Sequence, residues 1–120
     1  MPADVWFFDN SGNLYFIYRA RNWEAVPARY LDGTEIDSVV ATAVNADGAP
    51  ITVSQQPTYS NAHKGFIGWI SAGNIGGNRF LTIKLVPTVA AGINPGWAPE
   101  KLVDVVIDPG DESGAELRLE

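Results

Sequence analysis

The chain has 120 residues, 46% of them hydrophobic and 18% charged, which fits one globular domain with an ordinary core. Eight basic and 14 acidic residues give a net charge of −6, which excludes the basic surface that nucleic-acid binding requires, and no long apolar run predicts a membrane span. Cysteine is absent and His63 is the single histidine, which excludes disulfides, thiol nucleophiles and multi-histidine metal sites.

The first two apolar runs predict a β-hairpin with large side chains on both faces. Val5–Asp9 and Leu14–Arg19 are the strands, and the turn between them contains Gly12 beside Asn residues that tolerate positive φ. Along the first strand Trp6 and Phe8 alternate with Phe7, and along the second Tyr15 and Ile17 alternate with Leu14, Phe16 and Tyr18. One apolar face can pack on the domain, and the other then needs a partner protein or a second copy of the chain. A hairpin that lies wholly inside the domain is an equal alternative.

The rest of the chain predicts short strands separated by turns and loops. After an irregular connection over Ala20–Thr34, strands are expected at Ile36–Val44, Ile51–Val53, Gly65–Ser71, Phe80–Val86 and Lys101–Ile107. Glycine, proline and polar residues predict turns or loops at Asn45–Gly48, Gln55–Lys64, Gly73–Asn78 and Pro87–Pro99.

About seven strands at this spacing predict an all-β fold, an immunoglobulin-like antiparallel β-sandwich with an N-terminal β-hairpin. Trp69 is expected to be the core tryptophan of this sandwich. We divide the chain into the aromatic hairpin at 1–20, the sandwich at 21–108 and a flexible acidic tail at 109–120.

Few residues are suited to catalysis. His63 needs an orienting carboxylate before it can activate Ser60 or Ser71, and neither serine lies in a nucleophile-elbow motif, so a solvent-exposed loop histidine is the favoured interpretation. Asp32 and Glu35 are expected to cap or flank a turn rather than to form the acid pair of a glycosidase. We therefore predict a protein that is not an enzyme, with no catalytic residues and no cofactor.

Two further motifs point to ligands only weakly. Asp108, Asp111 and Glu112 offer oxygen ligands that suit Ca²⁺, but their spacing differs from an EF-hand, and a solvated acidic segment is favoured over a metal site. Gly73-x-x-Gly76-Gly77 lies between two predicted strands, whereas a phosphate-binding glycine loop precedes a helix, so we interpret it as a turn.

Aromatic loop residues provide a carbohydrate-binding alternative. Tyr59 and Trp97 lie in predicted loops, where exposed rings can stack on sugars, although Trp97 is expected more readily to cover one open end of the sandwich. The predicted interaction surface consists of Trp6, Phe8, Tyr15, Ile17 and Trp97.

Several short motifs resemble those of the fiber-tail adaptor family, which are small immunoglobulin-like virion proteins of tailed bacteriophages. The first is Asn22-Trp23-x6-Tyr30-Leu31-Asp32-Gly33-Thr34-x-Ile36-x-Ser38, and the second is Trp69-Ile70-Ser71-Ala72-Gly73-Asn74-Ile75-Gly76, followed by Phe80-Leu81-Thr82-Ile83. The resemblance covers residues 22–107, with Ala72 where the family usually has glycine, and it leaves out the aromatic hairpin.

The resemblance implies a non-enzymatic phage structural protein that links the tail or neck to fibers through protein–protein contacts. Its implied location is the virion, after assembly in the host cytoplasm. The expected partners are other virion proteins of the tail, neck, fiber or capsid, with no nucleic acid and no membrane, and self-association is left open. A capsid decoration protein of the same fold and a carbohydrate-binding module remain the alternatives.

Overall fold

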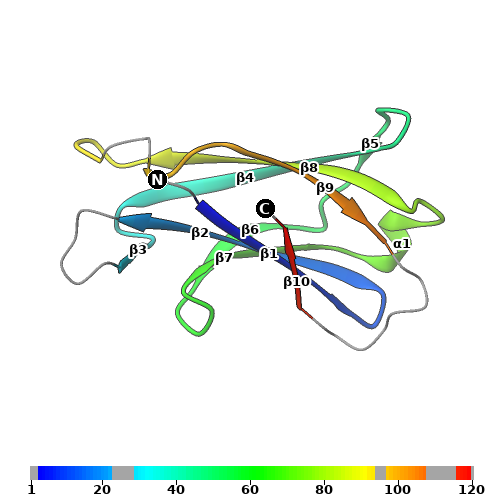
Figure 1. Ribbon diagram of the computed structural model, residues 1–120, viewed down its shortest axis with the longest axis horizontal. Coiled ribbons are helices and arrows are strands. Elements are labelled where there is room, and N and C mark those ends of the chain that lie inside the picture. The colour runs from blue at the N-terminus through cyan, green and yellow to red at the C-terminus, as the bar shows by residue number, and fades with distance from the viewer. Residues whose placement is uncertain (1–2, 23–28, 94–96, 108–115, 120) are drawn as a thin grey trace.

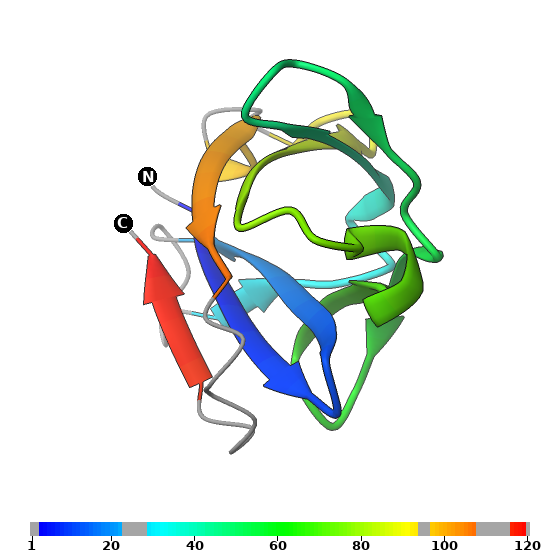
Figure 2. The same ribbon diagram turned by 90° about the vertical axis from the view of Figure 1, so that its right-hand side faces the viewer.

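The computed structural model contains two antiparallel β-sheets packed as a sandwich, described over residues 3–22, 29–93, 97–107 and 116–119 (Figure 1, Figure 2). The six-stranded sheet contains β1 (Ala3–Asn10), β2 (Asn13–Asn22), β3 (Arg29–Leu31), β6 (Gln55–Ser60), β7 (Gly65–Ile70) and β10 (Glu116–Leu119). The four-stranded sheet contains β4 (Ile36–Asn45), β5 (Pro50–Ile51), β8 (Phe80–Val89) and β9 (Lys101–Val106), and α1 (Ala72–Ile75) is one helical turn after β7. The predicted all-β antiparallel sandwich is confirmed.

The order of strands determines which of them carry an open edge. The six-stranded sheet runs β10-β1-β2-β7-β6, with β3 pairing to the far end of β2, and the four-stranded sheet runs β5-β4-β8-β9. Strand β8 lies between β4 and β9, and β9 pairs with β8 alone among the described strands.

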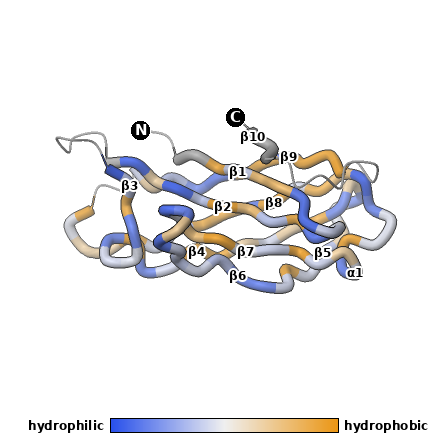
Figure 3. The backbone as a smooth tube through the Cα atoms, turned by 90° about the horizontal axis from the view of Figure 1, so that it is seen from below, coloured by the Kyte–Doolittle hydropathy of each residue, from blue (hydrophilic) through white to orange (hydrophobic). Residues whose placement is uncertain are grey.

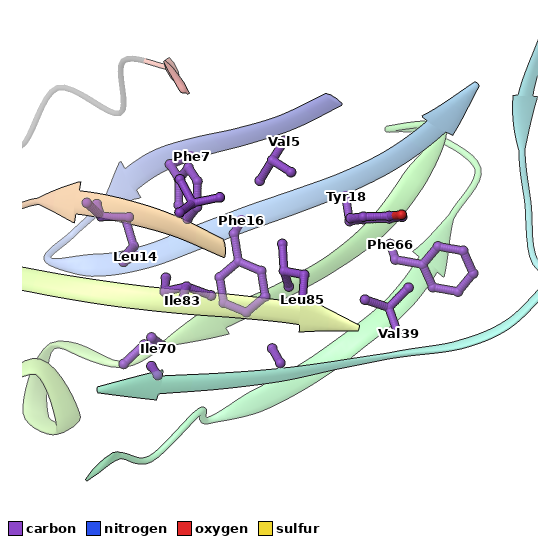
Figure 4. Packing of buried hydrophobic residues seen from close by; sticks show 14 of the residues in the cluster. Val5, Phe7, Leu14, Phe16, Tyr18, Val39, Phe66, Ile70, Ile83 and Leu85 are labelled. Atoms are coloured by element: carbon purple, nitrogen blue, oxygen red, sulfur yellow. The ribbon is translucent and has the colours of Figure 1, made fainter. Parts of the chain in front are cut away.

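One hydrophobic core fills the space between the sheets (Figure 4). Alternate residues of each strand point inward, as the period of a β-strand requires. The hairpin contributes Val5, Phe7, Leu14, Phe16 and Tyr18 to this core. The Tyr18 hydroxyl donates a 2.8 Å hydrogen bond to the carbonyl oxygen of Pro99, and burial raises the pKa of this phenol.

The hairpin is a central part of the sandwich. Strand β2 pairs with β1 on one side and with β7 on the other, so the hairpin lies inside the six-stranded sheet. Phe7, Phe16 and Tyr18 are fully buried between the sheets. The predicted boundary at residue 20 therefore does not separate two parts of the structure. The predicted alternation of side chains between the two faces of the hairpin is confirmed.

Strand β6 occupies a segment that the sequence predicts to be a loop. Pro57 lacks an N–H for strand pairing, and prolines in sheets are confined largely to edges and bulges. Both conditions hold here, because β6 is an edge strand and its register with β7 shifts between Gln55 and Thr58. The proline side chain is buried.

The Gln56 side chain joins the two sheets along one side of the sandwich. Its amide nitrogen donates to the Ala41 carbonyl at 2.9 Å, and its amide oxygen accepts from the Ala41 N–H at 2.7 Å. Because β5 pairs with β4 only at Ala43 and Val44, this side-chain amide replaces a neighbouring strand at Ala41.

The last described strand also differs from the expectation. The sequence predicts a flexible tail over 109–120, but residues Glu116–Leu119 form β10, which pairs antiparallel with β1. In this pairing Trp6 lies opposite Arg118, and Phe8 lies opposite Glu116. The possible calcium ligands Asp108, Asp111 and Glu112 lie outside the described residues.

Candidate docking surface

Three aromatic side chains form a row across the outer side of the six-stranded sheet. Phe8, Tyr15 and Trp69 are Cα partners on β1, β2 and β7. The Phe8 and Tyr15 rings stack with centroids 5.0 Å apart and planes 10° apart, and the Tyr15 and Trp69 centroids are 5.3 Å apart with planes at 36°. All three side chains are partly exposed. We call this row the aromatic ladder.

A second apolar row lies beside the ladder, toward the middle of the same strands. Trp6, Ile17 and Ile67 are Cα partners, so the two rows form one continuous apolar surface. Trp6 exposes 9% of its surface and Ile17 only 3%, and the Arg19 guanidinium covers the Trp6 indole at 4.2 Å from the ring centroid. Trp6 and Ile17 are therefore inaccessible as contact residues, which corrects the predicted surface at these two positions.

A small residue on β7 makes room for the Arg19 side chain. A Cβ at Gly65 would lie 2.7 Å from Cγ of Arg19 and 2.8 Å from Cγ2 of Ile17, so the arginine stem lies directly over the glycine. The Arg19 Nε donates to the His63 carbonyl at 2.8 Å, which fixes the guanidinium over Trp6. A side chain at position 65 would displace Arg19, so the cover that Arg19 forms over Trp6 requires glycine there.

Cationic and aromatic side chains continue this surface at its other end. The Arg21 guanidinium lies 5.2 Å from the Tyr30 ring centroid, and its Nη2 donates to the Tyr30 hydroxyl at 3.0 Å. Arg19 also lies over the Tyr30 ring, at 5.6 Å. The outer side of the sheet therefore changes from aromatic at the β1–β2 turn to cationic at the β2–β3 end.

The geometry of the ladder limits what it can bind. The Phe8 and Tyr15 rings stack nearly parallel at 5.0 Å, and the Tyr15 and Trp69 rings are tilted against each other at 5.3 Å, so each pair is in direct ring contact. Sugar rings stack on aromatic faces that are open to solvent, whereas Tyr15 has a neighbouring ring on each side. A row of rings in contact with one another is instead suited to packing against apolar protein side chains.

Trp97 and Tyr59 are not part of this surface. Both side chains are partly buried and pack against the core cluster, and Tyr59 meets Phe66 edge to face with centroids 5.4 Å apart. Desolvation raises the pKa of Tyr59, and the nearby Asp32 and Glu35 charges raise it further. Trp97 therefore packs against the core, but its side chain stays partly exposed, and its place in the predicted interaction surface remains a prediction.

Trp69 lies on the outer side of the sheet and not in the core. Along β7 the buried residues are Gly65, Phe66, Gly68 and Ile70, whereas Ile67 and Trp69 are partly exposed. The alternation of Phe66, Gly68 and Ile70 with Ile67 and Trp69 is visible in the sequence and could have placed Trp69 opposite the core. The expectation relied on the predicted immunoglobulin-like sandwich and did not follow this alternation.

The serine and histidine residues considered for catalysis form hydrogen bonds within turns and at a helix cap. Ser60 Oγ lies 3.1 Å from His63 Nδ1 and also accepts from the His63 backbone N–H at 3.4 Å, within an exposed turn between β6 and β7. Ser71 is the N-cap of α1, where its side chain accepts from the Asn74 backbone N–H. Neither serine has the serine–histidine–carboxylate arrangement of a hydrolase among the contacts of the described residues.

The predicted turn role of Asp32 and Glu35 is confirmed. Asp32 Oδ1 accepts from both the backbone N–H and the hydroxyl of Thr34, at 2.9 and 2.7 Å. These hydrogen bonds lower the pKa of Asp32, with a further contribution from the Arg29 charge. Glu35 accepts from the Asp32 backbone N–H at 3.2 Å and pairs with Arg29 at 3.1 Å.

The described part of the chain holds no cluster of metal-binding side chains and no membrane-spanning helix. No three or more His, Cys, Asp or Glu residues within it are grouped closely enough to hold a metal ion. Across the same residues no helix has the length and apolar character needed to cross a membrane.

Comparisons with protein-family models, with curated proteins and with solved structures found no match. The resemblance to fiber-tail adaptors therefore depends on the short motifs alone. Of these, Tyr30 and Leu31 lie in β3, Ile36 and Ser38 lie in β4, and the Trp69 motif spans the end of β7 and α1. Trp23, which opens the first motif, lies outside the described residues.

Proposed function

We propose that the chain is a non-enzymatic structural protein of a phage virion, an adaptor that links the tail or neck to fibers through protein–protein contacts. The aromatic ladder carries this proposal, because a partly exposed row of three rings on the outer side of a sheet is a surface that burial against another protein stabilises. The resemblance of the motifs to fiber-tail adaptors supplies the virion context.

The ladder favours a protein partner over a sugar. Tyr15 has a neighbouring ring on each side, and the two aromatics considered for a sugar platform, Tyr59 in β6 and Trp97, pack against the core. Aromatic side chains are enriched at the centres of protein interfaces because they bury a large area at low entropic cost.

The experiment measures binding of the full chain to the purified tail, neck, fiber and capsid proteins of the phage that encodes it. We expect one tail, neck or fiber protein to bind, and the Phe8→Thr and Tyr15→Thr double variant to weaken binding at least about tenfold. Threonine keeps the strand propensity of both positions, so the fold is retained.

The matched control removes apolar surface from the opposite sheet. Val40 and Val86 are Cα partners on β4 and β8, exposed by 50% and 37%, and their replacement with threonine should leave binding unchanged. Binding to the capsid proteins alone would identify a decoration protein instead. Binding to none of these proteins, or equal losses in both double variants, would show the proposal to be wrong.

A further inference from the structure

Strand β9 leaves one side of its backbone without a strand partner in the described structure. It pairs with β8 from Lys101 to Val106, and the Ile107 N–H continues this ladder to the Arg79 carbonyl at 2.7 Å. Because backbone groups of an antiparallel strand point alternately to its two sides, the N–H and C=O groups of Leu102, Asp104 and Val106 point away from β8. They form an open sheet edge.

The side chains at these same three positions lie on the outer side of the four-stranded sheet. Leu102 is exposed by 69% and Val106 by 56%, and Figure 3 shows β9 as a mostly hydrophobic strand. Asp104 lies between them, and its carboxylate accepts a 2.7 Å hydrogen bond from the Thr82 hydroxyl. On the neighbouring strand β8, Lys84 is the Cα partner of Leu102 and forms a salt bridge with Glu100 at 3.4 Å. Along the edge the outward side chains are therefore apolar at Leu102, anionic at Asp104 and apolar at Val106.

A second copy of the chain is a poor occupant of this edge. In a two-fold antiparallel pairing centred on the strand, Leu102 would lie opposite Val106 of the other copy, but Asp104 would lie opposite Asp104. Like charges directly opposite each other destabilise a strand pair. The whole chain carries a net charge of −6, which adds to the repulsion.

We propose that the β9 edge binds an extended segment of a partner protein whose outward side chains are apolar, cationic and apolar at alternate positions. The backbone of the segment would continue the four-stranded sheet, and its Lys or Arg would lie opposite Asp104 between the two apolar contacts. This proposal is independent of the aromatic ladder, which lies on the other sheet. Together the two surfaces would give the chain separate contacts for two partners.

The test uses the full chain and the seven-residue peptide Thr-Leu-Thr-Lys-Thr-Val-Thr, blocked at both ends, with a second peptide in which Glu replaces Lys. Nuclear magnetic resonance titration follows the backbone amides. We expect the Lys peptide to shift the amides of Leu102, Asp104 and Val106, and to bind about fivefold more tightly than the Glu peptide at low salt. In Asp104→Lys the preference should reverse.

Methylated peptides separate strand addition from loose apolar adsorption. Methyl groups on the amide nitrogens of Leu, Lys and Val should abolish binding, because these N–H groups face β9, whereas methyl groups on the inner Thr nitrogens should be tolerated. The Phe8→Thr and Tyr15→Thr double variant should bind the Lys peptide as the unchanged chain does, so the two proposals fail separately.

Three results would overturn the proposal. The first is a set of amide shifts that excludes β9. The second is equal affinity for the Lys and Glu peptides in both the unchanged chain and Asp104→Lys. The third is a dimer in light scattering whose Leu102, Asp104 and Val106 amides are already protected from hydrogen exchange, because a second copy would then occupy the edge.

Discussion

Gly68 allows the Phe16 ring to pack directly against the backbone of the neighbouring strand. A Cβ at this position would lie 2.5 Å from the Gln55 carbonyl oxygen and 3.0 Å from the Phe16 ring. The oxygen belongs to the backbone of β6 and the ring is fully buried, so neither can move aside at low cost.

We therefore expect Gly68→Ala to lower the free energy of unfolding by about 1–3 kcal/mol, the usual cost of overpacking a core. Urea denaturation followed by tryptophan fluorescence measures this change. Gly77→Ala is the matched control, because no atom lies within 4 Å of a Cβ there, and its effect should stay within about 0.5 kcal/mol. Equal stabilities of the two variants would contradict the packing argument.

Single residues also show where sequence reasoning succeeded and where it failed at the site. Alternation along the hairpin correctly placed Phe8 and Tyr15 together on one face, and the structure shows that this is the outer face of the sheet. It could not show that Trp6 is covered, because the covering Arg19 is held there by the His63 carbonyl, 44 residues away in sequence. Contacts between distant segments leave no periodic signal in either segment.

At the scale of elements, the Gln56 amide closes a stretch of strand edge that would otherwise lack a backbone partner. Both Ala41 backbone groups bond to it, at 2.7 and 2.9 Å, while the opposite side of β4 pairs with β8. One side chain therefore performs the role that a neighbouring strand performs elsewhere in the sheet.

Gln56→Ala should lower the free energy of unfolding by about 1–3 kcal/mol, because two backbone groups lose their partners. Hydrogen exchange at the Ala41 amide should also accelerate more than exchange at neighbouring amides of β4. Gln55→Ala is the control, since among the described residues the side-chain amide of Gln55 donates only to the exposed carbonyl of Gln56, at 3.1 Å. An unchanged exchange rate at Ala41 would show that the amide bridge does not hold in solution.

The elements differ in how well the sequence predicts them. The hairpin was located correctly because a turn around Gly12 separates two apolar runs, and β8 was located by its alternation of apolar and polar residues, although it continues past Val86 to Val89. Strand β6 was missed because its Pro57 is a strand breaker unless the strand lies at an edge, and edge position depends on the complete sheet. Strand β10 was missed because its pairing partner, β1, lies at the other end of the sequence.

For the whole molecule, the position of the hairpin decides whether the rest can fold alone. Removing residues 1–20 deletes Val5, Phe7, Leu14, Phe16 and Tyr18 from the shared core. Each buried side chain of this size contributes about 1.5–3 kcal/mol. The total stability of a domain is about 5–15 kcal/mol, so the loss is comparable to all of it.

We therefore expect a chain that starts at Arg21 to be unfolded or aggregated, whereas the full chain unfolds in one cooperative transition. Near-ultraviolet circular dichroism and light scattering of the two chains measure this difference. A truncated chain that remained a folded monomer would mean that the hairpin is an appendage, in conflict with the pairing of β2 between β1 and β7.

The aromatic ladder has an optical consequence. Phe8, Tyr15 and Trp69 are held at fixed separations and angles in an asymmetric environment, so their electronic transitions couple and contribute to the near-ultraviolet spectrum. A partner that excludes water from these rings would shift the emission of Trp69 as well. The surface proposed for docking therefore contains its own chromophores, and its occupancy can be followed in the unlabelled protein.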